Sequence, residues 1–144
     1  MPSFGKASLT SRAQLHPKLQ ALFDAAIKEV DFKILDAMRG RKAQEAAFKS
    51  GNSKVHFGDS AHNWKPAVAA DLFPAPYDWD NIAAFKALAV VILRIAKEQG
   101  TPIRWGGDFN MDGNKTKSDS WDPGHYELHP WRDWAKKYSK PFEG

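Results

Sequence analysis

The sequence contains no cysteine, and this absence excludes two kinds of structure. Neither a disulfide framework nor a thiolate metal site can form, so any zinc ion must be held by His, Asp or Glu side chains. The sequence also lacks a long apolar run: no segment approaches the ~18 apolar residues of a membrane span, and the first residues do not resemble a signal peptide. We therefore expect a protein that is made in the cytosol, does not insert into a membrane and does not export itself.

The sequence carries only a small excess of positive over negative charge. Lysine and arginine number 21 against 17 aspartate and glutamate residues, and the formal charge is +4. A positive charge favours approach to an anionic polymer such as nucleic acid or cell wall, but an excess of this size does not choose between them. The sequence has no lysine-rich run, so we expect no nucleic-acid partner.

The length and composition are those of one compact unit. In a chain of 144 residues, of which 42% are hydrophobic, we expect one core and one domain over residues 1–144, and a monomer. Six Trp and nine Phe are compatible with an aromatic core or with surfaces that stack on a ligand.

Apolar residues at three- and four-residue steps, together with end signals, predict three or four helices. They are expected over residues 17–29, 42–50 and 80–99, and in a terminal segment after Pro130. Pro17 suits the first position of its helix, Gly51 and Gly100 suit the ends of theirs, and Asp78 or Asp80 is expected to cap the longest one.

Short apolar runs between these helices predict strands. They are expected over residues 32–38, 68–73, 103–105 and 126–128, with loops over 51–66 and 106–120. The sequence thus predicts an α+β domain in which three to four helices lie beside a small, mainly antiparallel sheet.

Two segments carry the side chains that most clearly indicate chemistry. The first contains His62 and Asp71, and the second contains Asp122, His125 and Glu127. Two His nitrogens and one carboxylate oxygen are a common ligand set for catalytic zinc, because they leave a fourth position for a water whose pKa the metal lowers. The pattern predicts a hydrolase with a spare acid beside its second His ligand.

The expected secondary structure bears on whether these ligands can meet. His62 lies in a loop, Asp71 near the end of a strand and His125 at the start of another, so the fold itself must bring them together. Ligands at strand ends of one sheet can converge at its edge, and Gly124 allows a close backbone approach there. By spacing alone, a surface or hydrogen-bonded core histidine fits each position equally well.

Several short segments, in their order and spacing, carry a resemblance that covers nearly the whole chain. They are Phe4-Gly5-Lys6, Met38-Arg39 with Gln44, Gly51-Asn52-Ser53-Lys54, Ser60-Ala61-His62-Asn63, Ala70-Asp71, Tyr77-Asp78-Trp79, Arg104-Trp105-Gly106 and Gly124-His125-Tyr126-Glu127-Leu128. The chain resembles the zinc D,D- and L,D-peptidases of the VanX/VanY type, and most closely the small phage endolysins that act as L-alanyl-D-glutamate peptidases. The resemblance implies a hedgehog/D-Ala-D-Ala-peptidase-like fold.

Residue by residue, the resemblance implies the zinc ligands His62, Asp71 and His125. It also implies that Asp122 is the catalytic acid-base, although an aspartate before Pro-Gly also fits a simple turn. Arg39 falls where the family has an arginine that holds the substrate or steadies the oxyanion; a surface salt bridge is the alternative.

Two alternatives concern the same site. The interval between His62 and Asp71 is longer than is usual in the family, which leaves His56 as a competing ligand from the same loop. Glu127 is the rival of Asp122 as the base: positions 125 and 127 of a strand face the same side, so this carboxylate could reach the metal water or fix the orientation of a ligand histidine.

A second metal pattern follows the third expected strand. Oxygen-bearing side chains at the spacing of a calcium-binding loop are Asp108, Asn110, Asp112, Asn114 and Asp119. Lys115 and Lys117 reduce the negative charge of this segment, and a solvated loop rich in Asp and Asn is the alternative.

Three functions are compatible with the sequence. The first is a zinc endolysin that cuts the L-Ala-D-Glu bond of peptidoglycan and is released from the host cytoplasm to the wall through a membrane hole. The second is a D-Ala-D-Ala carboxypeptidase or dipeptidase. The third is a non-catalytic, zinc-stabilised wall-binding module, against which the spare acid argues.

Overall fold

The computed structural model describes residues 2–108, 111 and 121–144. Its elements are α1 (Lys6–Ala13), α2 (Pro17–Ile27), β1 (Phe32–Ile34), α3 (Arg41–Ser50), β2 (Trp64–Lys65), β3 (Ala69–Pro74), α4 (Ile82–Gln99), β4 (Ile103–Trp105), β5 (His125–Leu128), α5 (Trp131–Tyr138) and β6 (Lys140–Pro141). None of the helices in these ranges is long and apolar enough to cross a membrane.

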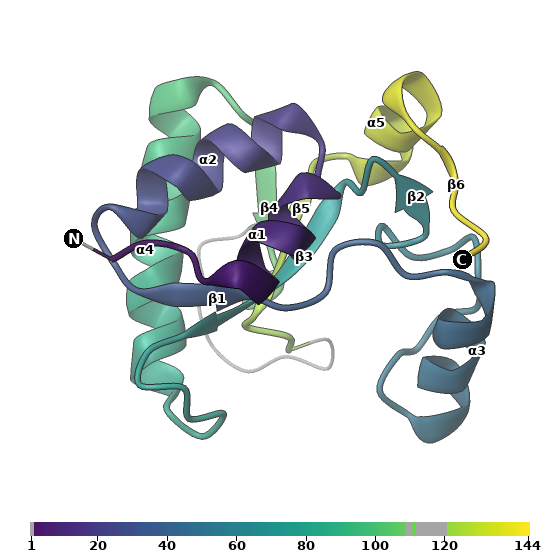
Figure 1. Ribbon diagram of the computed structural model, residues 1–144, viewed down its shortest axis with the longest axis horizontal. Helices are drawn as coiled ribbons and strands as arrows, with labels where there is room; N and C mark the ends of the chain where they lie inside the picture. Colours follow the sequence, from purple (N-terminus) through teal and green to yellow (C-terminus); the bar gives the residue numbers. More distant parts are fainter. Residues whose placement is uncertain (1, 109–110, 112–120) are drawn as a thin grey trace.

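Four strands form the main sheet in the order β1-β3-β5-β4, and each neighbouring pair is antiparallel. Strands β2 and β6 form a separate antiparallel pair. The mixed fold of helices and a small antiparallel sheet confirms the predicted class, with five helices in the described residues (Figure 1).

The core lies between the sheet and a pair of helices. Helices α2 and α4 pack on each other, and α4 also contacts β3 and β4, at the side of the molecule away from α3 (Figure 1). The apolar faces that the sequence predicted for these helices are buried, among them Leu19, Leu22, Leu88 and Ile92. Burial of such side chains is the main favourable term in the stability of this half.

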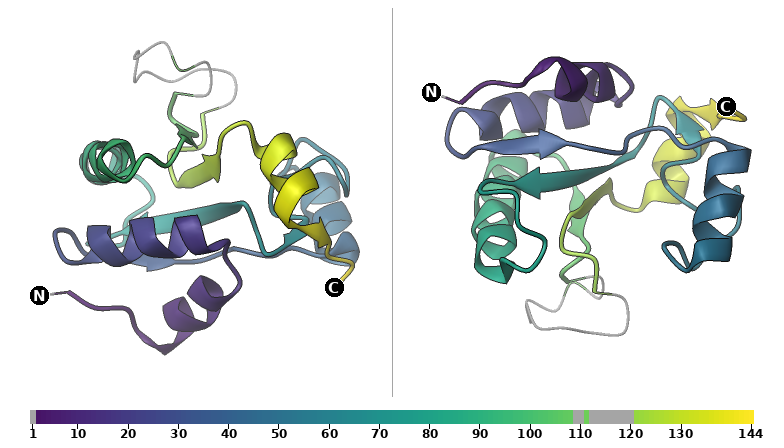
Figure 2. Two further views of the ribbon diagram at one scale, coloured as in Figure 1. Left: turned by 90° about the horizontal axis from the view of Figure 1, so that it is seen from above. Right: turned by 60° about the horizontal axis from the view of Figure 1, so that its bottom comes forward.

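The opposite end of the molecule is more polar. Helices α3 and α5 and the β2–β6 pair lie together there, beside the C-terminus (Figure 2). Helix α3 begins where the backbone N–H of Arg41 donates to the carbonyl of Glu143, and Gln44 is its buried residue. Helix α3 is therefore held by polar contacts, whereas α5 contributes Trp131 and Ala135 to the hydrophobic core.

Several helix ends agree with the sequence. Pro17 begins α2, and Gly51 and Gly100 follow α3 and α4 with φ of 85° and 69°, a left-handed conformation that glycine adopts without steric cost. The predicted N-cap of α4 was wrong. Asn81, rather than Asp78 or Asp80, accepts a side-chain hydrogen bond from Ala84 N.

Other elements lie outside what the sequence predicted. Helix α1 has few apolar residues, and Ser8, its buried residue, contributes by accepting a hydrogen bond from the backbone of Ile34 in β1. Strands β2 and β6 have two residues each, too few to show a periodicity. Strand β1 ends at Ile34, and the chain beyond it runs on into the site described next.

Candidate metal centre

The register of the sheet brings together the first two side chains of the site. Asp71 of β3 and His125 of β5 are directly paired across the antiparallel ladder. Paired residues of neighbouring strands project to the same face of a sheet. Nδ1 of His125 accordingly lies 3.2 Å from Oδ1 of Asp71.

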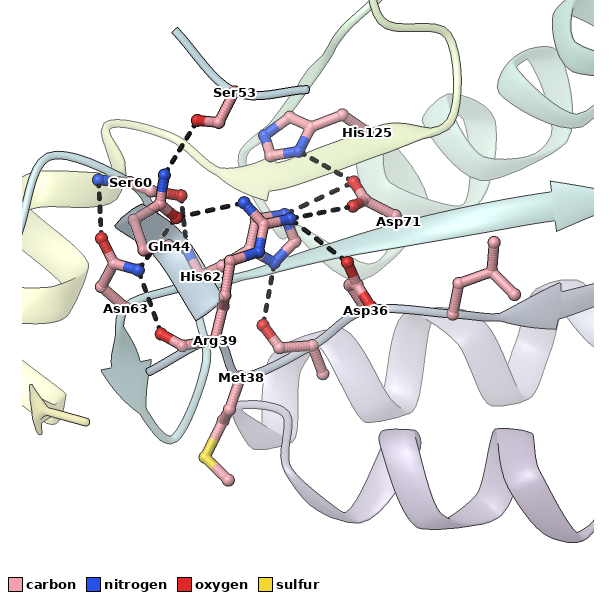
Figure 3. Close-up of polar contacts among 12 residues, drawn as sticks. Asp36, Met38, Arg39, Gln44, Ser53, Ser60, His62, Asn63, Asp71 and His125 are labelled. Carbon is pink, nitrogen blue, oxygen red and sulfur yellow. Dashed lines mark hydrogen bonds and ion pairs between the residues drawn. The ribbon is translucent and has the colours of Figure 1, made fainter. Parts of the chain in front are cut away.

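The third side chain, His62, comes from the turn before β2. Its Nδ1 lies 2.8 Å from the carbonyl oxygen of Ala37, a partner that fixes the ring and requires the proton on Nδ1. Its other ring nitrogen, Nε2, lies 3.4 Å from Oδ1 of Asp71. Both imidazoles thus direct one nitrogen toward the same carboxylate, as Figure 3 shows.

The three side chains form a group that could hold a metal ion. One ligand atom from each of His62, Asp71 and His125 lies within 4.8 Å of the others, and both histidines are buried. Two neutral nitrogens and one carboxylate oxygen match a divalent metal with one open position. The surroundings of each ring hold it in place without requiring the metal.

The charges in this group favour a cation. Burial of Asp71 opposes its ionisation, but the charges and hydrogen bonds of His62 and His125 outweigh burial and hold the pKa of Asp71 well below its usual range. Burial also opposes protonation of His125, but its contacts with Asp71 and Glu127 outweigh burial and raise the pKa of His125 to about 10. A proton on His125 therefore occupies the place that a metal ion would take.

Glu127 lies behind the second histidine. Its Oε1 is 2.7 Å from Nε2 of His125, and its Oε2 accepts hydrogen bonds from Nε and Nη2 of Arg104 at 3.0 and 2.7 Å. Arg104 and Glu127 are paired across β4 and β5. With both oxygens engaged in this way, Glu127 is better placed to orient His125 than to receive a proton from water.

Arg39 lies on the other side of Asp71, on the chain between β1 and α3. Its Nη2 is 3.2 Å from Oδ2 of Asp36 and 3.7 Å from Oδ2 of Asp71, and its Nη1 donates to Oε1 of Gln44 at 3.1 Å (Figure 3). The side chain is mostly buried, unlike a surface salt bridge. Arg39 thus places a permanent positive charge beside the ligand group.

Asp122 occupies the turn that precedes β5. Its carbonyl accepts from the backbone N–H of His125, and its own N–H donates to the carbonyl of Gly106. A side chain at Gly106 would clash, because a Cβ there would lie 1.9 Å from the carbonyl oxygen of Asp122. The backbone of Asp122 therefore forms a turn, while its carboxyl group lines the pocket beside the ligands.

The carboxyl of Asp122 differs from an ordinary surface acid. Burial, and to a smaller extent the charge of Asp71, raise its pKa above the usual value, against the opposing influence of His125, His62 and Arg39. A raised pKa brings a carboxyl group closer to the range in which it can both take and return a proton.

These side chains line one pocket of about 670 Å³, a volume in the range of small-molecule sites. The candidate ligands lie in it together with Arg39, Asp122 and Glu127. Residues 51–55 form part of its wall, and Trp121 and Trp131 contribute aromatic surface. With the exception of His56, the sequence-predicted candidates for the zinc site are thus brought to a single cavity.

Among the described residues, the alternative zinc ligand and the candidate calcium ligand do not belong to this group of side chains. His56 is exposed, with Nδ1 2.8 Å from Oε2 of Glu45 on α3, and it is not part of the ligand group. Of the calcium candidates, Asp108 lies just after β4, whereas Asn110, Asp112, Asn114 and Asp119 lie outside the described residues.

Some contacts of the site were not predicted. The sequence gives no sign that the Ala37 carbonyl holds His62, or that Asp36 pairs with Arg39. The pair of Arg104 and Glu127 could have been found only with the register of β4 and β5, since the two residues are far apart in the chain.

The fold and this group of side chains define the class: a mixed α/β domain with a His-Asp-His group in a pocket, as in metal-dependent hydrolases. The family model of the phage L-alanyl-D-glutamate peptidases matches residues 2–129. The chain belongs to this family, and it is accordingly a peptidase.

Individual relatives agree with the family. The L-alanyl-D-glutamate peptidase of Escherichia phage T5 is 28% identical over 137 residues, which cover 87% of this chain and 96% of the relative. The crystal structure of the Serratia marcescens L-Ala D-Glu endopeptidase ChiX superposes with a TM-score of 0.70 at 23% identity, and the match covers 92% of this chain and 94% of that one. At this level of identity, the similarity to the Serratia structure supports the fold of the chain.

Proposed function

We propose that this protein is a zinc-dependent peptidoglycan endopeptidase that hydrolyses the L-Ala-D-Glu bond of bacterial stem peptides. One observation carries the proposal: His62, Asp71 and His125 offer ligand atoms within 4.8 Å of one another, in a pocket that also contains Asp122 and Arg39. Membership in the family, and the name of the T5 relative, supply the substrate.

The three candidate ligands fit zinc. Because the chain has no cysteine, nitrogen and oxygen donors must suffice, and two imidazoles with one carboxylate are a ligand set of catalytic zinc sites. When bound, zinc supplies a Lewis acid for the scissile carbonyl and lowers the pKa of a water toward neutrality. Glu127 supports the site by holding the far nitrogen of His125.

Asp122 is the acid-base in this proposal. Its raised pKa suits a carboxylate that accepts a proton from the attacking water and passes it to the D-Glu nitrogen as the peptide bond breaks. The products are then a stem fragment with a C-terminal L-Ala carboxylate and a peptide with a free D-Glu amine.

Arg39 supplies positive charge on the other side of Asp71. Its guanidinium is fixed by Asp36 and Gln44, and it remains charged at any working pH. A fixed cation beside a reacting carbonyl offsets the negative charge that develops on the carbonyl oxygen. In the proposed reaction Arg39 therefore binds the substrate or stabilises this charge.

The biological setting follows from the same proposal. A phage enzyme that cuts peptidoglycan acts in host lysis, and it accumulates in the host cytoplasm until a membrane hole gives it access to the wall. Peptidoglycan is its partner in this setting.

Mass spectrometry of purified peptidoglycan after digestion tests the function. The zinc-loaded protein should release fragments with a new N-terminal D-Glu, and the His125→Ala variant, matched in concentration, should not. Loss of terminal D-Ala would instead identify a D-Ala-D-Ala carboxypeptidase, and an unchanged digest with a zinc-loaded protein would identify a non-catalytic wall-binding module.

A further inference from the structure

Helix α3 is attached to the protein through an amide side chain. Gln44 has no exposed surface, and it is the buried residue of this helix. A buried primary amide is costly unless its donors and acceptor are satisfied. The partners of Gln44 therefore show what the helix is fixed to.

The amide of Gln44 has partners on two sides. Its Nε2 donates to Oγ of Ser53 and to the carbonyl of Val55, both at 2.8 Å, in the wall of the pocket. Its Oε1 accepts from Nη1 of Arg39 and from Nδ2 of Asn63, both at 3.1 Å. The four hydrogen bonds account for both donors and both lone pairs of the amide.

The two partners of Oε1 connect Gln44 with the candidate metal centre. Asn63, also without exposed surface, follows the ligand His62, and its Nδ2 donates to the carbonyl of Arg39 as well. The backbone N–H of Arg39 in turn donates to the carbonyl of His62 at 2.7 Å. Main chain and side chain of Arg39 are thus tied to the same buried network (Figure 3).

Two carboxylates compete with this network for the guanidinium of Arg39. Nη2 lies 3.2 Å from Asp36 and 3.7 Å from Asp71, while Gln44 holds Nη1. Charge-assisted pairs with carboxylates are stronger than a bond to a neutral amide. Without Gln44, the guanidinium would be free to turn fully onto these acids and to leave the orientation that Gln44 gives it.

We propose that Gln44 is a positioning residue, which keeps Arg39 aimed into the pocket and joins it to the wall formed by residues 53–55. The inference rests on the proposed function, in which Arg39 acts on the substrate. Gln44 itself contacts no reacting atom; it acts through Arg39.

Two substitutions separate this role from simple attachment of the helix. Gln44→Met has a similar size and removes all four hydrogen bonds. Gln44→Glu keeps the acceptor that holds Arg39 and Asn63, and loses the two donors to Ser53 and Val55. If Gln44 only attaches α3, Gln44→Glu should be at least as harmful as Gln44→Met. Gln20→Met, which removes one hydrogen bond on α2, is the matched control.

The first readout needs neither metal nor substrate. In NMR spectra of ¹⁵N-labelled protein, the guanidinium signals that disappear in Arg39→Lys belong to Arg39. We expect them to be retained in Gln44→Glu and Gln20→Met, and to shift or broaden in Gln44→Met. Unchanged Arg39 signals in a folded Gln44→Met variant would overturn the proposal.

The second readout is kinetic, with the zinc-loaded enzyme and peptidoglycan fragments. We expect kcat of Gln44→Met to fall about 10- to 100-fold, as for other residues that support a reactive group, with KM little changed. Gln44→Glu should keep kcat near the parent's value. Adding Gln44→Met to Arg39→Ala should cost little more, because the two changes remove the same interaction.

Losses that multiply in the double variant, or equal losses in Gln44→Met and Gln44→Glu, would overturn the positioning role. Failure of the proposed function is a separate result. In that case the parent enzyme would release no new N-terminal D-Glu, while the NMR comparison would still decide whether Gln44 positions Arg39.

Discussion

Glu127 and His125 are neighbours on one face of β5, with Oε1 of Glu127 2.7 Å from Nε2 of the imidazole. They are two residues apart, and side chains at that spacing in a strand project to the same side. The opposite nitrogen, Nδ1, faces Asp71 at 3.2 Å. A carboxylate on one ring nitrogen fixes the tautomer and aims the other nitrogen at a metal.

Removal of Glu127 should therefore weaken metal binding. In Glu127→Ala we expect the zinc affinity to fall about 10- to 100-fold, because His125 loses the partner that orients its ring. Competition with a zinc chelator at fixed pH measures the change. Arg104 would also lose its buried partner, so the fold of the variant is compared with the parent by circular dichroism.

Glu127→Gln is the control for this prediction. The amide oxygen can still accept from Nε2 of His125, so its zinc affinity should lie between those of Glu127→Ala and the parent. An unchanged zinc affinity in Glu127→Ala, together with lost turnover, would contradict the orienting role. It would identify Glu127 as the base.

The ligand group makes a second prediction. His62→Ala, Asp71→Ala and His125→Ala should each abolish stoichiometric zinc binding, because two protein ligands do not hold the ion tightly. Elemental analysis after dialysis measures the zinc content. His56→Ala is the matched control: this imidazole pairs with Glu45 on the surface, so its variant should retain the metal. The reverse pattern, with zinc lost only in His56→Ala, would exclude His62 as a ligand.

Asp122 is tested by an amide of nearly the same shape. Asp122→Asn should retain zinc and fold but lose about 10²- to 10⁴-fold in kcat, the usual cost of removing a general acid-base. Asp59→Asn is a suitable control, because Asp59 lines the same pocket but lies away from the ligand group and pairs with Arg132 at the surface. If Asp122→Asn turned over substrate near the parent's rate, Asp122 would not be the acid-base, and its role would be limited to forming the turn before β5.

The elements that position the site were predictable to different degrees. The helix over 17–29 and the one over 80–99 have long apolar stripes, and α2 and α4 confirm them within a few residues at each end. In α4 the capping side chain was assigned wrongly, because Asp78, Asp80 and Asn81 are equally good caps in sequence. Helix α1 was missed because its buried contact is polar.

The candidate site depended on tertiary contacts that local patterns do not contain. The approach of Asp71 to His125 follows from strand register, and register is set by the whole sheet. The alternatives His56 and His62 come from the same loop, and in the structure His62 is buried against the Ala37 carbonyl whereas His56 is exposed beside Glu45. The sequence could therefore indicate which residue types form the site, and the resemblance indicated which positions they occupy. Neither could identify the residues that hold these side chains in place, such as Ala37 and Arg104.

A last prediction concerns the stability of the contact between α2 and α5. His16 is the N-cap of α2: its Nδ1 accepts from the backbone N–H of Lys18 at 3.0 Å, which requires an unprotonated Nδ1. Its ring packs against Trp134 and Tyr138 of α5, at centroid distances of 5.5 and 5.1 Å. Burial, and to a smaller extent Lys18, lower the pKa of His16.

Because the pKa of His16 is lower in the folded protein than the ~6.5 of an unfolded chain, the unfolded state binds more protons as the pH falls below that value. The contribution of His16 to the free energy of unfolding should therefore decrease on acidification from about pH 7.5 to about pH 5. His16→Asn keeps a capping oxygen but cannot titrate, so it should start less stable, through lost contact with Trp134 and Tyr138, and lose less on acidification. Denaturant unfolding of the metal-free proteins at both pH values measures the two differences. His125, whose pKa is raised to about 10 in the folded protein, adds a stability change of opposite sign in parent and variant alike, so the difference between the two proteins reports His16. Equal losses in parent and variant would show that protonation of His16 does not destabilise the fold.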